Sequence, residues 1–488
     1  MPLAPSASLL ATVPPVTPVA PVTVDRVVLR PPSVSEEARR WFALAVGSLV
    51  VAGLLSLSVV VGRLPGLSRL IQDPLFFKRC LVVHVDLSLL VWFYAFLAGL
   101  VALAVPRRNS WIGAVTCSVA VVGVGAMLAG GMVPGAQPVL ANYIPVIDHS
   151  LFLSGLVLFF VAITAYVLSA VWRSSSALES TWLPPASAAG VKVAAVAIPL
   201  AGVTWFAAFS GLPAGVDAWT FYEFTAWGPG HVLQVANAAM MLAVWLWVLQ
   251  RVTGAAVLSG RAAARWFAVL LAPQFVLPLL TARGTLDTLY HSGATQLMRW
   301  GIFPVVLILL GLGLRHLWRH RAASPAPARR ALLTGFTASA GLTVFGFILG
   351  ACIRSSTTLV PAHYHASLGG VTVALMTAAY LVAEAVSGNR GVRPGLWRSA
   401  GRQLALFGSG QAVFVLGFAI GGAYGLGRKA YAAEQHVRST GEYTGLIVMG
   451  IGGLVAVAGG LWFLFLLLRE IRGWWPRGPR PSFSHPHP

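Results

Sequence analysis

The sequence predicts an all-α polytopic membrane protein with 12 transmembrane helices in one membrane domain. Of its 488 residues, 57% are hydrophobic and only 10% are charged, whereas a soluble protein of this size carries about 25% charged residues. Apolar runs of roughly 20 residues, the length that a helix needs to cross a bilayer, recur along the chain. The net charge of +20 does not indicate nucleic-acid binding, because the basic residues lie in the short loops between apolar runs, where membrane topology explains them.

The predicted spans follow one another with short linkers and show no internal repeat. They cover residues 41–62, 82–105, 111–133, 149–171, 188–210, 229–250, 264–282, 300–318, 331–351, 362–385, 402–424 and 444–468. Residues 1–40, rich in proline and alanine at their start, predict a disordered cytoplasmic tail, and residues 471–488 predict a second cytoplasmic tail. The cysteines Cys80, Cys117 and Cys352 have no metal-binding spacing, which favours free thiols.

The distribution of basic residues predicts the orientation of the chain. Lysine and arginine number 24 on one side of the predicted spans and 10 on the other, which accounts for all 34. Because cytoplasmic loops carry the excess of basic residues, both termini are expected in the cytoplasm.

Six of the 11 histidines then fall at one depth, near the outer face. They are His84, His149, His231, His291, His363 and His365. A single histidine at a helix end is often only a polar cap. Six at one depth indicate function, because ionisable groups are costly in a membrane and imidazole is the commonest metal ligand.

The spacing of His363 and His365, in "PAHYHASLGG" at the start of the tenth predicted span, is informative. Each residue of an α-helix turns by about 100°, so these two side chains point about 200° apart. They cannot share one metal, but they can bind two metals on opposite faces of the helix. Iron porphyrins are the natural candidates, because each accepts an axial histidine.

At these residues the sequence resembles the haem-copper oxidase superfamily, subunit I, which includes cytochrome c oxidase and bacterial nitric oxide reductase. The resemblance rests on "VPAHYHASLGGVTVALM", "RCLVVHVDLSLLVWFYAFLAGL", "WGPGHVLQVANAAMML" and "GGAYGLGRKAYAAEQ", and it covers about residues 41–470. It implies that His84 and His365 are the axial ligands of a low-spin haem, and that His363 is the proximal ligand of a high-spin haem that binds a gas. Arg428 and Lys429 would pair with haem propionates.

The resemblance implies a second metal opposite the open haem, and here the sequence departs from the family. His231 matches the first copper ligand, but the histidine pair expected in the seventh span is missing. Three interpretations stay open. Copper is held by His231, His291 and a third ligand such as His149; or a non-haem iron is held with Glu223 or Asp148; or His231 donates a hydrogen bond to a gas without any metal.

The predicted function is therefore a membrane haem oxidoreductase that reduces O2 or NO, with His231 as the catalytic residue outside the haem ligands. Its electron donor would be a cytochrome c or a second subunit, because the chain has no Cys-x-x-Cys-His motif. The expected location is the bacterial inner (plasma) membrane, and coupling to proton uptake stays open. The alternatives are a haem protein for electron transfer or gas sensing without turnover, and a 12-span transporter without haem.

Overall fold

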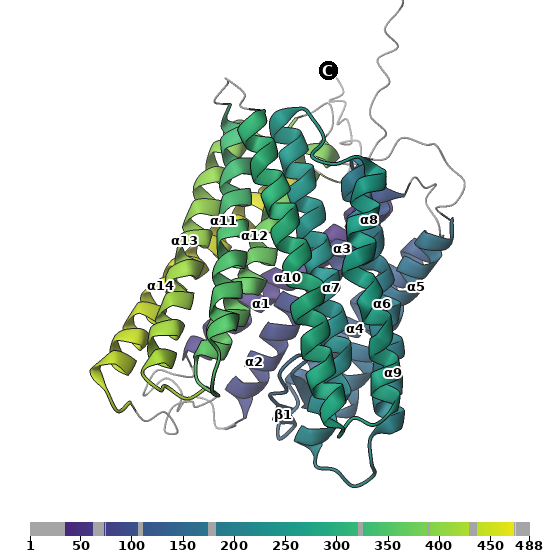
Figure 1. The fold of residues 1–488 in the computed structure, drawn as a ribbon, viewed down its shortest axis with the longest axis vertical. Helices are drawn as coiled ribbons and strands as arrows, with labels where there is room; N and C mark the ends of the chain where they lie inside the picture. Colours follow the sequence, from purple (N-terminus) through teal and green to yellow (C-terminus); the bar gives the residue numbers. More distant parts are fainter. Residues whose placement is uncertain are drawn as a thin grey trace, which may run out of the picture. The chain divides into compact units, whose positions relative to one another are not determined.

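The computed structural model describes a bundle of membrane-spanning helices (Figure 1). The described residues are 35–61, 73, 75–105, 111–173, 182–320, 326–387, 391–428, 437–472 and 474. Within them, twelve helical segments are long and apolar enough to cross a membrane. The predicted fold class and number of spans are confirmed.

The helices have the following bounds. In the first half of the chain they are α1 (Glu36–Val61), α2 (Phe76–Asp86), η2 (Leu87–Val91), α3 (Trp92–Ala104), α4 (Trp111–Gly131), α5 (Ser150–Arg173), α6 (Pro185–Gly211) and α7 (Ala218–Thr253). In the second half they are α8 (Gly260–Leu271), η3 (Ala272–Val276), α9 (Leu277–Ala282), α10 (Thr288–Arg319), α11 (Pro327–Cys352), α12 (Leu359–Ser387), α13 (Leu396–Ala423) and α14 (Thr440–Ile471).

Two of the spans are built from more than one helix. The second span joins α2 and α3 through η2, a π-helical turn that begins three residues after His84; such turns are frequent at functional sites. The seventh span joins α8 and α9 through the 3-10 turn η3, which contains Pro273. The break follows from proline's missing N–H and from the clash of its ring with the preceding turn.

Three spans are far more buried than the rest. We compare the most apolar stretch of 18 residues in each span. In α7, 94% of these residues are buried, and in the α2–α3 span and in α12 the share is 83%; in the other nine spans it is 33–50%. These three buried spans carry His231, His84 and the pair His363 and His365. Four of the six histidines predicted near the outer face therefore lie on these largely buried helices; the His231 side chain is buried, and the other three are half-buried.

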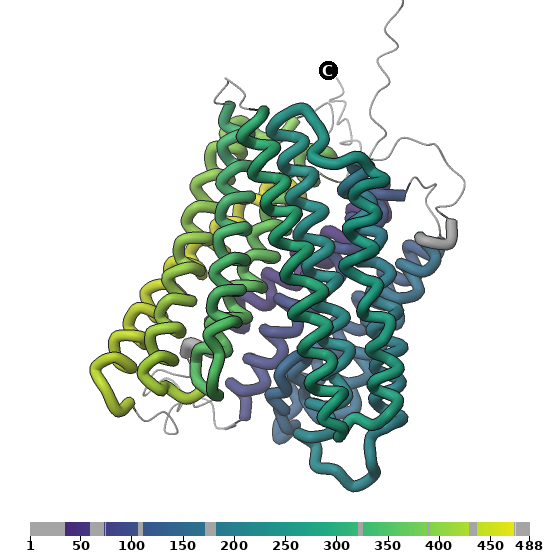
Figure 2. The backbone as a smooth tube through the Cα atoms, viewed as in Figure 1, coloured from purple at the N-terminus to yellow at the C-terminus, as the bar shows by residue number. Residues whose placement is uncertain are grey.

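The packing of the helices explains this burial. Helix α12 contacts α7, α11, α13 and α14, and consecutive spans pack pairwise, with α4 on α5, α6 on α7 and α13 on α14. Figure 2 follows the chain through these neighbours. Helix α1 contacts both α3 and α14, and Arg39 at its start donates to the carbonyl of Trp474 at 3.0 Å. The beginning of the first span and the end of the last therefore lie at the same end of the bundle.

One short hairpin interrupts the helices. Strands β1 (Gln137–Val139) and β2 (Val146–Asp148) pair antiparallel between α4 and α5. Gly135, which precedes β1, has φ +78°, a conformation that favours glycine in a tight turn. Both strands contact α2, and β1 also contacts α7. The hairpin thus lies against two of the three buried spans.

Some helices begin earlier than the sequence suggested. Helix α7 starts at Ala218 rather than residue 229, because Asp217 caps it by accepting the N–H of Thr220 at 3.1 Å. Helix α10 starts at Thr288 rather than residue 300, so its first turn includes His291. Helix α1 begins at Glu36, inside the predicted N-terminal tail. The rest of that tail and almost all of the predicted C-terminal tail lie outside the described residues.

Candidate functional site

The structure places His363 and His365 on opposite faces of α12, as their spacing predicts. The His363 ring faces α11, where its Nδ1 donates to the carbonyl of Gly346 at 2.7 Å. A Cβ on Gly350 would lie only 2.7 Å from that ring, so only a glycine lets α11 come this close. The His365 ring faces α13, stacked on Phe418 with ring centroids 5.3 Å apart and planes 9° apart.

His84 and His365 come from two different spans, α2 and α12. Their imidazoles are near enough for a charge on one to act on the other. The Nδ1 of His84 donates to the carbonyl of Ala52 in α1 at 2.8 Å, which leaves Nε2 as the nitrogen with a free lone pair. A second hydrogen-bond partner of this kind fixes the tautomer and ring orientation of a metal-binding histidine.

His231 is more constrained than the other three. Its Nδ1 donates to the carbonyl of Trp227 at 2.7 Å, and its Nε2 lies 2.9 Å from the hydroxyl of Tyr143. The two rings are 4.8 Å apart. Since Nδ1 carries the proton, Nε2 accepts the hydrogen bond from the phenol. Burial raises the pKa of Tyr143 far above its usual range, and the nearby Glu223 carboxylate raises it further, so the hydroxyl stays protonated as a donor.

Tyr143 lies in the segment that links β1 to β2, and α7 holds this segment at two points. The Glu223 carboxylate accepts the backbone N–H of Asn142 at 2.7 Å and also its side-chain amide. The hydroxyl of Tyr222 donates to Asp148 at 2.7 Å. Glu223 and Asp148, considered from sequence as iron ligands, are therefore both engaged in holding the hairpin.

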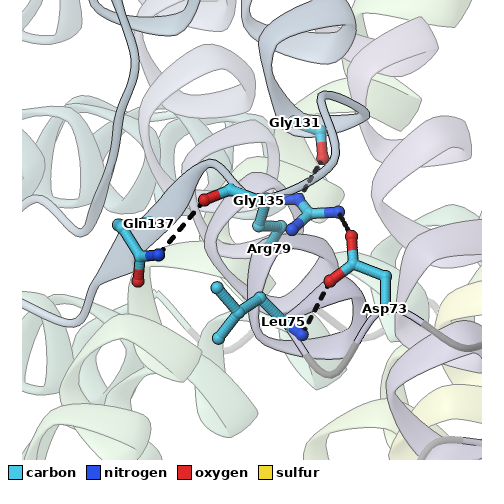
Figure 3. A network of polar contacts seen from close by, with 6 residues as sticks. All are labelled: Asp73, Leu75, Arg79, Gly131, Gly135 and Gln137. Atoms are coloured by element: carbon cyan, nitrogen blue, oxygen red, sulfur yellow. Dashed lines mark hydrogen bonds and ion pairs between the residues drawn. The ribbon is translucent and has the colours of Figure 1, made fainter.

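Figure 3 shows how the approach to the hairpin is anchored on α2. Arg79, whose side chain is 1% exposed, donates to the carbonyl of Gly131 at 2.9 Å and forms an ion pair with Asp73 at 2.5 Å. Asp73 also accepts the N–H of Leu75 at 2.9 Å. The Arg79 guanidinium lowers the pKa of Asp73 by hydrogen bonding to it. A buried arginine with these partners fixes the end of α4, from which the hairpin departs.

The remaining sequence candidates lie in other settings. The Nε2 of His291 donates to the carbonyl of Thr285 at 2.9 Å, and its ring packs on Trp227 at 5.1 Å. The Nδ1 of His149 accepts the N–H of Leu151 at 3.3 Å, at the start of α5. Within the described part of the chain, no three histidine, cysteine, aspartate or glutamate side chains are gathered closely enough to hold a metal ion.

The basic pair after the eleventh span is only half described. Arg428 is half-buried, whereas Lys429 lies outside the described residues. All three cysteines are free thiols, as expected.

Sequence reasoning missed Tyr143, Asn142 and Trp227. A signal existed in "WGPGH", because a Cβ on Gly230 would lie 2.3 Å from the Tyr143 ring. A glycine immediately before a histidine in a buried helix indicates that something packs closely there, although it does not reveal what.

Comparisons with known proteins give the fold but no assigned function. No protein-family model matches the chain. An uncharacterized protein of Aquifex aeolicus (strain VF5) is 28% identical over 70% of this chain and 83% of its own. The uncharacterized protein RP382 of Rickettsia prowazekii (strain Madrid E) is 24% identical over 88% of this chain and 94% of its own.

A cryo-EM structure of a heme-copper terminal oxidase dimer matches the fold with a TM-score of 0.70. The match covers 90% of this chain and 84% of the oxidase chain, at 16% identity. The chain is therefore an all-α membrane protein of twelve spans. Its helices have the arrangement of a heme-copper terminal oxidase.

Proposed function

We propose that the chain is a membrane-embedded haem oxidoreductase subunit that passes electrons through one haem to a second, gas-binding haem. One observation carries the proposal. Two histidines two residues apart lie on opposite faces of the buried helix α12, and one of them, His365, lies near His84 of a second buried span. The three side chains are half-buried, and an imidazole nitrogen withdrawn from water without a partner costs stability; an iron held at Nε2 would be such a partner.

The residues present fit two haems. In His84 and His363, a backbone carbonyl binds Nδ1 and leaves Nε2 for an iron. The His365 ring contacts the rings of Phe414 and Phe418, so its surroundings are apolar, which suits a haem. In this proposal His84 and His365 are the ligands of the low-spin haem, and His363 is the single axial ligand of the high-spin haem. Arg428 and Lys429 are assigned to the propionates on the family resemblance.

When bound, a haem with two axial histidines transfers electrons, and one with a single axial histidine keeps an open position for a small gas. The protein residues contribute position and exclusion of water. Gly346 and Gly350 let α11 lie against the His363 ring. The amide of Gln411 donates to the carbonyl of His365 at 2.9 Å, which ties α13 to this turn of α12. Most of α12 is buried, which limits the access of water to the half-buried side chains of His363 and His365.

The proposed substrates are O2 or NO, and the proposed electron donor is a cytochrome c or a second subunit. Both curated relatives come from bacteria, and a haem-bearing electron-transfer chain of twelve spans suits the bacterial inner (plasma) membrane. The basic-residue count supports cytoplasmic termini, and the contact between the two ends of the described bundle is consistent with this orientation.

A pyridine haemochrome assay of the purified protein tests the proposal, together with steady-state consumption of O2 and NO in the presence of a competent donor. Two haems per chain and gas consumption are expected. Protein that folds without haem would overturn the proposal.

A second candidate is a haem protein that transfers electrons or senses a gas without turnover. The surroundings of His231 in α7 favour this candidate, because the described histidine, cysteine, aspartate and glutamate side chains there do not form a three-ligand metal site. Gas binding without consumption, with the donor shown to reduce the haems, would select this candidate.

A further inference from the structure

Both nitrogens of His231 already have partners in the protein. Nδ1 is 2.7 Å from the carbonyl of Trp227, and Nε2 is 2.9 Å from the hydroxyl of Tyr143. The side chain is 1% exposed, so water does not compete for either bond. A metal ion at His231 would need the Nε2 lone pair that the phenol now occupies.

The phenol is held in place from several directions. Its ring packs on Gly230, where any Cβ would collide with it, and it contacts Trp227 edge-on with ring centroids 5.4 Å apart. The residue before it, Asn142, is bound through two N–H groups by Glu223, whose own exposure is 3%. The Tyr143–His231 hydrogen bond is therefore buried and held in place by the surrounding contacts.

The donors near His231 do not fit a retained copper or iron ion. Such a site needs three or more ligands, and a single imidazole holds a metal weakly. His291, the nearest other histidine expected in the site, uses its Nε2 toward the carbonyl of Thr285. Glu223 is directed to Asn142, and His149 caps α5.

We propose that Tyr143 is a positioning residue that holds His231 in a hydrogen-bonded phenol–imidazole pair, at the place where related folds would hold a second metal. The pair fixes the Nδ1–H tautomer of His231 and closes its Nε2 to metal ions. Glu223 acts through Asn142 to position the phenol. The hydrogen bond between Tyr143 and His231 does not depend on the proposed function. Any effect of this pair on a gas bound at the His363 haem rests on the proposed function.

Nitrogen-15 NMR of the purified protein, labelled at histidine, tests the pair directly. The His231 signals are identified by their loss in His231→Gln. In the unaltered protein, Nε2 is expected as an unprotonated nitrogen shifted by an accepted hydrogen bond. Tyr143→Phe keeps the ring on Gly230 but removes the donor, so the Nε2 signal should move toward that of a free acceptor.

Tyr290→Phe is the matched control. Tyr290 lies in the same region, but its hydroxyl donates to the carbonyl of Phe224 and accepts the N–H of Gly228, so its loss should leave the His231 Nε2 signal in place. Glu223→Gln keeps both rings and should shift the signal partway. An Nε2 signal that is the same in Tyr143→Phe as in the unaltered protein would overturn the proposal.

A metal-binding experiment tests whether the Nε2 of His231 is closed to metal ions. The haem-loaded protein and His231→Gln are incubated with copper under reducing conditions, washed with chelator and analysed for metal. Equal copper contents are expected. One copper per chain that disappears in His231→Gln would overturn the closed site. Haem content is measured in the same samples, so absence of haem contradicts the proposed function while the NMR result still decides the pair.

Discussion

His84 and His363 differ from His231 in the hydrogen bonding of their Nε2 atoms. At His84 and His363, a backbone carbonyl accepts a hydrogen bond from Nδ1, and no residue that the structure describes is a hydrogen-bond partner of Nε2. At His231, a carbonyl binds Nδ1 in the same way, but the hydroxyl of Tyr143 fills Nε2. The carbonyl comes from a neighbouring helix at His84 and His363 and from the preceding turn of α7 at His231. The difference at Nε2 comes from a single side chain, which the segment between β1 and β2 supplies.

The difference shows that two properties are independent of each other: the positions of the histidines on the buried spans, and the gathering of several side chains into a second metal site. The proposed haem ligation would use histidines of two largely buried spans, and their positions are set by α2 and α12. A second metal needs several side chains from different elements to converge on one point. That convergence is replaced here by contacts that hold the hairpin, since Glu223 and Asp148 bind Asn142 and Tyr222.

The largest expected effect comes from the haem side. Replacing His365 by leucine should abolish the low-spin spectrum, because one of the two proposed axial ligands is lost while the apolar setting of Phe414 and Phe418 remains. The optical spectrum of the reduced protein and its haem content measure this. His149→Gln, at a helix cap away from the pair, should leave the spectrum unchanged. An unaltered low-spin spectrum in His365→Leu would contradict the assignment of this residue.

The next largest effect is expected on the other side of the comparison. In Gly230→Ala the new Cβ would lie 2.3 Å from the Tyr143 ring, so the ring has to move and the bond to His231 is lost. Overpacking of this kind costs about 3 kcal/mol, and the thermal unfolding midpoint should fall accordingly. Gly202→Ala in α6 is the control, because nothing lies within 4 Å of its Cβ. Equal midpoints for the two variants would show that the packing at Gly230 is loose.

The placement of His363 and His365 on opposite faces of α12 was predictable from sequence, because it depends on helical periodicity. The 200° separation of His363 and His365 follows from one number, the turn per residue, and the structure puts the two rings against different neighbours, α11 and α13. The number of spans follows from hydropathy in the same way.

The His231 side was not predictable, because it depends on contacts between residues far apart in the chain. Tyr143 and His231 are separated by 88 positions, and no local pattern fixes the path of the β1–β2 hairpin. The early start of α7 was missed because its first turns are rich in polar and aromatic residues. A membrane-span criterion gives such residues little weight, although Asp217 caps the helix by an ordinary mechanism.

A smaller effect is expected when the hairpin is loosened without overpacking it. Glu223→Gln replaces a carboxylate that accepts two N–H groups of Asn142 by an amide with a single acceptor oxygen. The loss of one hydrogen bond to a charged group predicts a cost of about 1.5 kcal/mol. Thermal unfolding measures this cost, and copper retention should not change. Tyr222→Phe, which loses one bond to the more exposed Asp148, should cost less. A larger cost for Tyr222→Phe would place the main anchor of the hairpin at Asp148 instead.

The smallest effect concerns the pair Asp73 and Arg79, and it is lost in acid. The Arg79 guanidinium, bonded to Asp73, lowers the pKa of this carboxyl below its ordinary value of 3.8. A group with a depressed folded-state pKa stabilises the fold above its unfolded pKa, and this contribution disappears as pH falls through the folded value. The unfolding midpoint of the unaltered protein should therefore exceed that of Asp73→Asn by a constant margin from pH 7 to about pH 5.

Below that range the two midpoints should converge, because protonated Asp73 resembles asparagine in charge. Arg79 keeps its bond to the carbonyl of Gly131 in both proteins, so the margin should be modest. Asp217→Asn is an informative companion, since the pKa of Asp217 is lowered by hydrogen bonds from Thr220 rather than by a cation. Added salt should narrow the Asp73 margin only slightly, because Arg79 is 1% exposed and salt screens buried charges far less than exposed ones. An Asp73 margin that persists unchanged at pH 3 would mean that the carboxyl orders the start of α2 through its bond to the N–H of Leu75 rather than through its charge.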